Sequence, residues 1–330
     1  MFQTAGSFSN PRKLSALVLS SLLIAGTAVT ASFAVQLSQV RTVEVGKSPT
    51  FVDLSPDGRI LFVSGFASNE ITVINTGDFN IEAEFYSGHE PVGIALNPAG
   101  SKLFIANRAG GLVKVIDTVT YENLDDVKVG DTPMNVTVSP TGFQAFVSNY
   151  GRGKIGRIDV IDAASHRITA EIEVGVRPLV ALVAPLADRL YVACGGSNDV
   201  YVIDILNSMV IKQIPVGEGP DGLAFSPDGN TLYVANSGTN DLSVVDLIEL
   251  REVRRAKVGS RPFSLAVLDD GSILVVETGD NALSLYSPDL ERLTSIRAGD
   301  NPQHIVLSPD ERTAYVTSEK SHEVIVFEIR

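Results

Sequence analysis

Apolar residues along this chain fall in short runs that are separated by turn-forming residues, a pattern typical of β-strands. In the stretch Glu218–Gly259 the pattern predicts four strands, at Leu223–Ser226, Leu232–Ala235, Leu242–Asp246 and Glu252–Val258. The turn Pro227-Asp228-Gly229 ends the first strand, because proline fixes φ and glycine can take a positive φ. No segment of helical period is long enough to connect parallel strands, so the pattern predicts antiparallel all-β structure.

The same unit recurs seven times along the chain. Each copy is introduced by a glycine with a proline three residues later, at Gly46, Gly88, Gly130, Gly175, Gly217, Gly259 and Gly299. Successive glycines are 42, 42, 45, 42, 42 and 40 residues apart, and a fixed period of this size indicates a propeller, a solenoid or an array. A closed ring buries both faces of each four-stranded unit against its neighbours. We therefore predict a single seven-bladed β-propeller over residues 36–330.

The two ends of the repeat region complement each other. The last unit, Asp300–Arg330, stops after its third strand, Glu323–Ile329, so its fourth strand is missing. Residues Gln39–Val45 precede the first full unit and look like a detached fourth strand. We expect this N-terminal strand to complete the last blade and to clasp the ring.

The turn Ser-Pro-Asp-Gly, followed by a strand of the type Tyr-Val-Ala-Asn, resembles the YVTN-type β-propeller repeat of bacterial and archaeal envelope proteins. The instances are LSPDGRILFVSG from Leu54, LNPAGSKLFIAN from Leu96, VSPTGFQAFVSN from Val138, FSPDGNTLYVAN from Phe225 and LSPDERTAYVTS from Leu307. The resemblance covers residues 39–330 and implies a propeller, with a lactonase-like activity as one option within that group. Units four and six depart from the pattern, with APLADRLYVACGG and LDDGSILVVETG.

Residues 1–35 differ from the rest of the chain. An arginine and a lysine precede an uncharged apolar stretch, residues 14–35, that ends in small residues. This predicts a secretory signal peptide cleaved after Ala31 or Ala34, with an uncleaved N-terminal anchor as the alternative. We therefore expect a periplasmic or secreted protein, and the lumen of a eukaryotic organelle stays open.

Charge and composition exclude several classes of function. The formal net charge is −13, which disfavours nucleic acid and anionic membrane surfaces as partners. The chain has no Cys-x-x-Cys-His haem motif, no tryptophan and four histidines without local metal-ligand spacing, so we expect no cofactor and no metal. Cys194 is the only cysteine and has no activating base nearby in sequence, which favours an inert thiol.

The residues near the repeated prolines are the candidates for function. In a propeller of this strand order, the links between blades and the loops between strands two and three surround one mouth of the central channel. Side chains there differ from blade to blade, and the candidate ligand or partner residues are Glu90, Arg177, Asp221, Arg261 and His304. Arg177 and Arg261 can face a shared anion, or they can pair with Glu218, Asp221 or Asp300 at the rim.

A basic island interrupts the acidic sequence in unit three, the one unit that is three residues longer than the common period. Its cations are Arg152, Lys154 and Arg157. The island is either a solvated, lengthened hairpin or a docking loop for an acidic protein or carboxylated ligand.

Two functions fit these observations. The first is an exported, non-catalytic binding or scaffold propeller whose partner is another protein or an envelope ligand, and membership of an extracytoplasmic redox or envelope assembly is open by analogy. The second is a lactonase-like hydrolase that uses carboxylates and arginines at the channel mouth.

Overall fold

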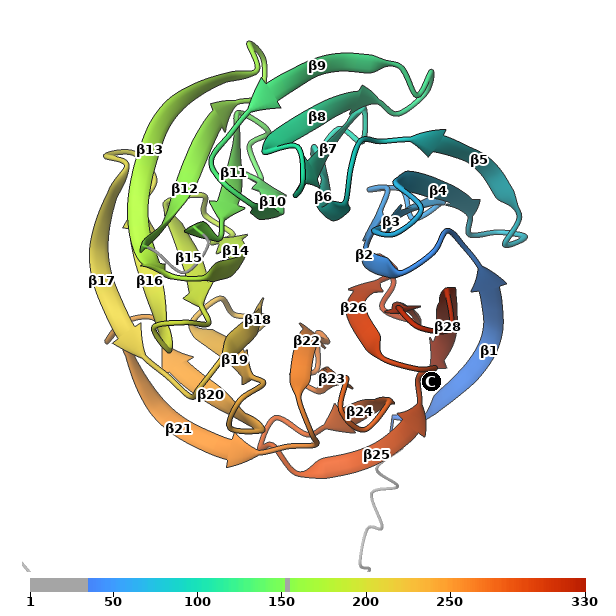
Figure 1. The fold of residues 1–330 in the computed structure, drawn as a ribbon. Coiled ribbons are helices and arrows are strands. Elements are labelled where there is room, and N and C mark those ends of the chain that lie inside the picture. Colours follow the sequence, from blue (N-terminus) through green and yellow to red (C-terminus); the bar gives the residue numbers. More distant parts are fainter. Residues whose placement is uncertain (1–34, 152–154) are drawn as a thin grey trace, which may run out of the picture. The chain divides into compact units, whose positions relative to one another are not determined.

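The strands predicted from the repeat form a ring of seven four-stranded antiparallel sheets, which confirms the predicted seven-bladed β-propeller (Figure 1). The computed structural model describes residues 35–151 and 155–330, so the predicted signal segment lies almost entirely outside the described residues. In each blade the strands follow one another from the channel to the rim.

The blades comprise the following strands, from the innermost to the outermost: blade 1, β2 (Pro49–Leu54), β3 (Ile60–Gly65), β4 (Glu70–Asn75) and β5 (Ile81–Tyr86); blade 2, β6 (Pro91–Leu96), β7 (Lys102–Asn107), β8 (Leu112–Asp117) and β9 (Asn123–Lys128); blade 3, β10 (Pro133–Val138), β11 (Gln144–Asn149), β12 (Ile155–Asp162) and β13 (Arg167–Val176); blade 4, β14 (Pro178–Val183), β15 (Arg189–Cys194), β16 (Asp199–Asp204) and β17 (Met209–Pro215); blade 5, β18 (Pro220–Phe225), β19 (Thr231–Asn236), β20 (Asp241–Asp246) and β21 (Arg251–Lys257); blade 6, β22 (Pro262–Val267), β23 (Ile273–Glu277), β24 (Ala282–Tyr286) and β25 (Arg292–Arg297); blade 7, β26 (Pro302–Leu307), β27 (Thr313–Ser318), β28 (Glu323–Ile329) and β1 (Leu37–Glu44).

The ring is closed by strands from both ends of the chain. β1 pairs antiparallel with β28, from Leu37 opposite Ile329 to Glu44 opposite Glu323. The prediction that the N-terminal strand completes the last blade is therefore confirmed.

Each innermost strand begins at the repeated proline, earlier than the sequence pattern predicts. In blade 5 the strand starts at Pro220 and not at Leu223. Proline lacks an N–H, and the first residue of a strand on the channel edge needs none, so proline is tolerated there. The irregular first turns of units four and six form like the others: the Ala187 and Gly271 N–H groups donate to the carbonyls of Ala184 and Leu268, both at 2.8 Å.

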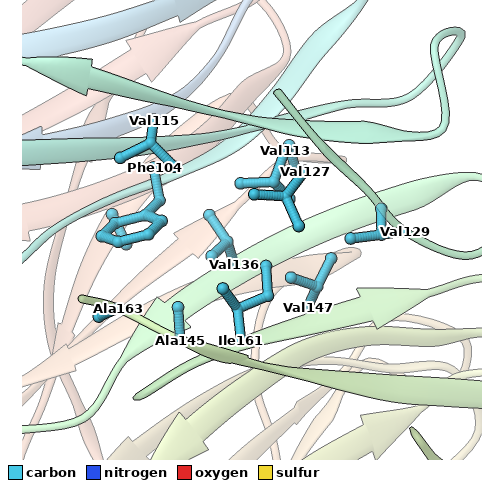
Figure 2. Packing of buried hydrophobic residues seen from close by; sticks show 12 residues of the cluster. Phe104, Val113, Val115, Val127, Val129, Val136, Ala145, Val147, Ile161 and Ala163 are labelled. Atoms are coloured by element: carbon cyan, nitrogen blue, oxygen red, sulfur yellow. The ribbon is translucent and has the colours of Figure 1, made fainter. Parts of the chain in front are cut away.

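The hydrophobic core lies between neighbouring blades. Figure 2 shows one such interface, where Phe104, Val113 and Val127 of blade 2 face Val136 and Ile161 of blade 3. The side chains of this cluster are almost completely buried. Since every blade contributes one face to each of two interfaces, the blades stabilise one another around the ring.

The repeated glycines are required by close packing against the blade that each link enters. A Cβ atom on Gly217 would lie 2.5 Å from Cγ of Asn236, at the end of the second strand of blade 5. A Cβ atom on Gly130 would lie 2.9 Å from Cγ of Asn149 at the same place in blade 3. The glycine therefore recurs at a fixed period because each link makes the same close contact with the blade that it enters.

A second close approach, between innermost strands, gives a test of this packing. A Cβ atom on Gly222 would lie 2.5 Å from the carbonyl oxygen of Phe263 in the next blade. We expect Gly222→Ala to lower the free energy of unfolding by about 1–3 kcal/mol, because backbone must shift to admit the methyl group. Denaturant unfolding measures this change. Gly77→Ala is the control, since only the Asn75 side chain lies near its Cβ, at 3.2 Å; an equal loss in both variants would contradict the explanation.

Candidate binding site at the channel mouth

The residue before each repeated proline has a left-handed backbone. These seven positions have φ between 49° and 63°, and they are Ser48, Glu90, Thr132, Arg177, Gly219, Arg261 and Asn301. Only one is glycine, although side chains at left-handed φ cost about 1–2 kcal/mol each. The links therefore hold six non-glycine residues in a conformation that the surrounding contacts must maintain.

Hydrogen bonds from two neighbouring blades maintain this conformation. The carbonyl of Glu90 accepts the N–H of Arg108 at 2.9 Å, and all seven links repeat this bond to the loop between strands two and three. The N–H of Glu90 donates to Oδ1 of Asn69 in the preceding blade at 2.9 Å. Where the ring closes, His322 takes the place of asparagine, and its Nδ1 accepts the Ser48 N–H at 3.1 Å. His322 therefore acts in ring closure.

The mouth contains an apolar cavity of about 220 Å³ that is lined by residues of six of the seven blades. Seven of the ten come directly after a repeated proline or one residue later, among them Phe51, Val92, Leu179 and Phe263. The complete lining is Thr50, Phe51, Phe66, Val92, Arg108, Met134, Leu179, Phe263, Gln303 and Glu319. On blade 5, the position after the proline is Asp221.

One ion pair stands at the rim of the apolar cavity. The Arg108 guanidinium lies 3.3 Å from the Glu90 carboxylate and 5.3 Å from the centre of the Phe66 ring. Glu90, a predicted site residue, is therefore an orienting partner of a cavity-lining arginine. Arg108 and Phe66 belong to loops between strands two and three, and the sequence prediction missed both.

Asp221 lies in a different electrostatic environment from the surface carboxylates. Burial raises the pKa of Asp221 to about 6, although a hydrogen bond from Ser237 and the charges of Arg177 and Arg261 act to lower it. Neither arginine forms an ion pair with Asp221 among the residues that the structure describes. The structure thus brings these three predicted residues within electrostatic reach without direct pairing.

Arg177 leans toward blade 3. Its Nε donates to the hydroxyl of Tyr150 at 2.6 Å, and its guanidinium lies 5.1 Å from the centre of the Tyr150 ring. Gly196 makes room here, because a Cβ atom on it would lie 2.7 Å from Cγ1 of Val176 and 3.0 Å from Cδ of Arg177. The expected alternative pairing of Arg177 with Glu218 or Asp300 does not occur in the described residues.

His304 is the second residue after the repeated proline of blade 7, and its side chain lies beside blade 1. Its ring lies 4.5 Å from that of Phe51, centre to centre, and burial lowers its pKa to about 4. Its Nδ1 is buried and has no hydrogen-bond partner within the described residues. His304 is therefore a neutral group of the channel wall at physiological pH.

The remaining predicted groups lie elsewhere. Arg157 pairs with Asp159 and Glu171 at 2.7 Å and 2.6 Å, so it is engaged within blade 3. Arg152 and Lys154 lie outside the described residues. Cys194 is fully buried, and burial raises the pKa of its thiol, which disfavours the reactive thiolate. In residues 35–151 and 155–330, no three His, Cys, Asp or Glu side chains converge as a metal site requires.

Comparison with known proteins supports a β-propeller and leaves the activity open. The family model described as SMP-30/Gluconolactonase/LRE-like region matches residues 187–320, less than half of the chain. No curated protein matches the sequence. The matched region includes Asp221, Arg261 and His304.

Among solved structures, 1754 chains match this propeller, so the fold is shared by many proteins. One of them is titled "Kuenenia stuttgartiensis Hydrazine Synthase". It is 21% identical in sequence, with a TM-score of 0.78, and the match covers 85% of this chain and 95% of that chain. At this identity the similarity establishes the fold alone. No helix in the described part of the chain is long and apolar enough to cross a membrane.

The raised pKa of Asp221 predicts a pH-dependent stability. Between about pH 4 and 6 the folded protein keeps a proton that the unfolded chain has released, so this group makes the free energy of unfolding fall as the pH rises. At pH 7.5 the free energy of unfolding of Asp221→Asn should be higher than that of the wild type by up to about 3 kcal/mol, and near pH 3.5 the two values should be equal. Urea denaturation at both pH values measures this difference.

Asp57→Asn is the matched control for this prediction. Hydrogen bonds from Ser55 and the Arg59 N–H hold the pKa of the Asp57 carboxyl below its ordinary value, so its replacement should destabilise at pH 7.5. Destabilisation of Asp221→Asn by the same amount at both pH values would contradict the environment described for Asp221.

Proposed function

We propose that this protein is an exported, non-catalytic binding propeller whose channel mouth receives apolar side chains of a partner. The observation that carries the proposal is the apolar cavity shared by six blades, with the Arg108–Glu90 ion pair at its rim. Its volume of about 220 Å³ is below the roughly 300–1,000 Å³ of clefts that enclose drug-sized ligands. A cavity of this size suits one or two side chains of a protein, or the apolar end of an envelope ligand.

The place of action is part of the same proposal. The apolar stretch of residues 14–35 supports export to the periplasm or cell surface, and the YVTN-type repeat supports a role in the envelope. The similarity to a hydrazine synthase chain fits a subunit of an assembly, but it supports the fold more than the role.

Co-purification of partners from the native host tests whether the channel mouth is the binding surface. We expect the double variant Met134→Ser and Phe263→Ser to lose at least about fivefold of the co-purified partner relative to the wild type, since polar groups would replace the apolar wall of the cavity. Ile81→Ser, on the outer strand of blade 1, is the control and should retain the partner. Equal recovery by the mouth variant, with an unchanged melting temperature, would refute a mouth-based interface.

A second candidate is a lactonase-like hydrolase, which one observation favours. Asp221 has a pKa raised to about 6 beside two arginines, as a general base near neutral pH requires, and it lies in the region matched by the gluconolactonase-like family model. A hydrolase would lose at least about a hundredfold in kcat/KM in Asp221→Asn, and its wild-type rate would rise through pH 6. The binding proposal predicts background rates for both proteins on a lactone panel.

A further inference from the structure

The face opposite the mouth carries a group of exposed apolar side chains. The turns between strands one and two and between strands three and four lie on that face. Four large side chains on the turns of blades 3, 4 and 5 form a group that we name the turn-face patch. They are Phe143, Leu186, Leu206 and Ile248, and their exposed fractions are 72%, 87%, 90% and 79%. Clustered exposed apolar groups with polar surroundings are typical of interaction sites.

The first turn of blade 4 exposes Leu186 and lacks a stabilising hydrogen bond that the first turn of blade 1 has. In blade 1, Asp57 occupies the equivalent position and accepts a hydrogen bond from the Ser55 hydroxyl at 2.6 Å. Blade 4 has Leu186 and Ala184 at these two positions, so that bond cannot form. Ala187 also takes a φ of 56°, where glycine would avoid the strain. Departures from local sequence rules are expected at functional or strained sites.

The patch borders two grooves. Leu186 and Ile248 line a groove of about 370 Å³ between blades 4 and 5, over the Tyr191 ring. Leu206 lines a second groove of about 500 Å³ between blades 3 and 4, and Gln144, the neighbour of Phe143 in sequence, lies on its other side. Both grooves include Asp188 and Arg189, so they adjoin each other.

The grooves carry an excess of negative charge. Asp188 and Asp228 line the first groove, and Asp188 and Asp204 line the second. Arg189 is the one cation in either lining, and it lies 3.7 Å from Asp188. Hydrogen bonds from the turns hold the pKa of Asp204 and of Asp228 below the ordinary value, so both stay ionised.

This charge decides between the possible occupants. A symmetric contact with a second copy would bring Asp188, Asp204 and Asp228 against the same residues of the other molecule. An anionic membrane surface would be repelled in the same way. A protein segment with lysine or arginine beside its apolar side chains would fill the grooves with the apolar groups and pair its cations with the carboxylates.

We propose that the turn-face patch docks a segment of a partner protein that presents apolar side chains flanked by basic residues. This goes beyond the mouth proposal, because it uses the other face of the ring and different blades. The two surfaces would let one propeller bridge two partners.

Fluorescence anisotropy with defined probes tests this docking. The probes are a short amphipathic peptide of leucine and lysine and its counterpart with glutamate in place of lysine. The leucine–lysine peptide should bind at least about tenfold more tightly than the leucine–glutamate peptide. The double variant Leu186→Ser and Ile248→Ser should lose about tenfold in affinity for the first peptide. Val119→Ser, an 82% exposed residue on a turn of blade 2 outside both grooves, is the control and should bind like the wild type.

Other outcomes would overturn the proposal. Equal binding of the two peptides, or equal loss in Val119→Ser, would show that the patch does not select this chemistry. A dimer in sedimentation that the double variant abolishes would assign the patch to a second copy, and loss of phosphatidylcholine-vesicle binding in that variant would assign it to a membrane. The mouth variant Met134→Ser and Phe263→Ser should leave peptide affinity unchanged, which separates failure here from failure of the mouth proposal.

Discussion

The packing of each inter-blade link against the blade that it enters determines both the scaffold and the site. A glycine fits where a Cβ atom would collide with the blade that the link enters. The loop between strands two and three of that same blade donates to the carbonyl of the left-handed residue, and a side chain of the preceding blade, such as Asn69, accepts its N–H. Proline then starts the innermost strand. Because these contacts fix the link on both sides, the side chain before each proline and the one after it are held at the channel mouth.

This constraint explains why the fold was readable from the sequence. A contact that recurs in every blade leaves the same glycine and proline seven times, and a missing strand at one end of the repeat predicts its replacement from the other. The start of the innermost strands was placed too late, since the chain pattern gives no sign that proline itself joins the strand. Its place on the channel edge becomes visible only in three dimensions.

The candidate site could be predicted from the sequence only in part, for a related reason. Arg177 and Arg261 come directly before the repeated prolines of blades 4 and 6, and Asp221 comes directly after the proline of blade 5 between them, so the repeat alone places the three near one another. The apolar wall was missed because it depends on the residue directly after each proline, where Val92, Leu179 and Phe263 resemble ordinary core residues. The state of His304 depends on Phe51, which only the closure of the ring brings beside it.

Departures from the repeat mark both candidate surfaces, one at the mouth and one on the turns of blades 3 to 5. Hydrogen–deuterium exchange on the protein isolated with its native partner, compared with the protein alone, tests the mouth most directly. The account predicts added protection in the loops at residues 66–69 and 108–111 and in the links before the repeated prolines. Unchanged exchange in those loops, with protection confined to the outer strands, would contradict it.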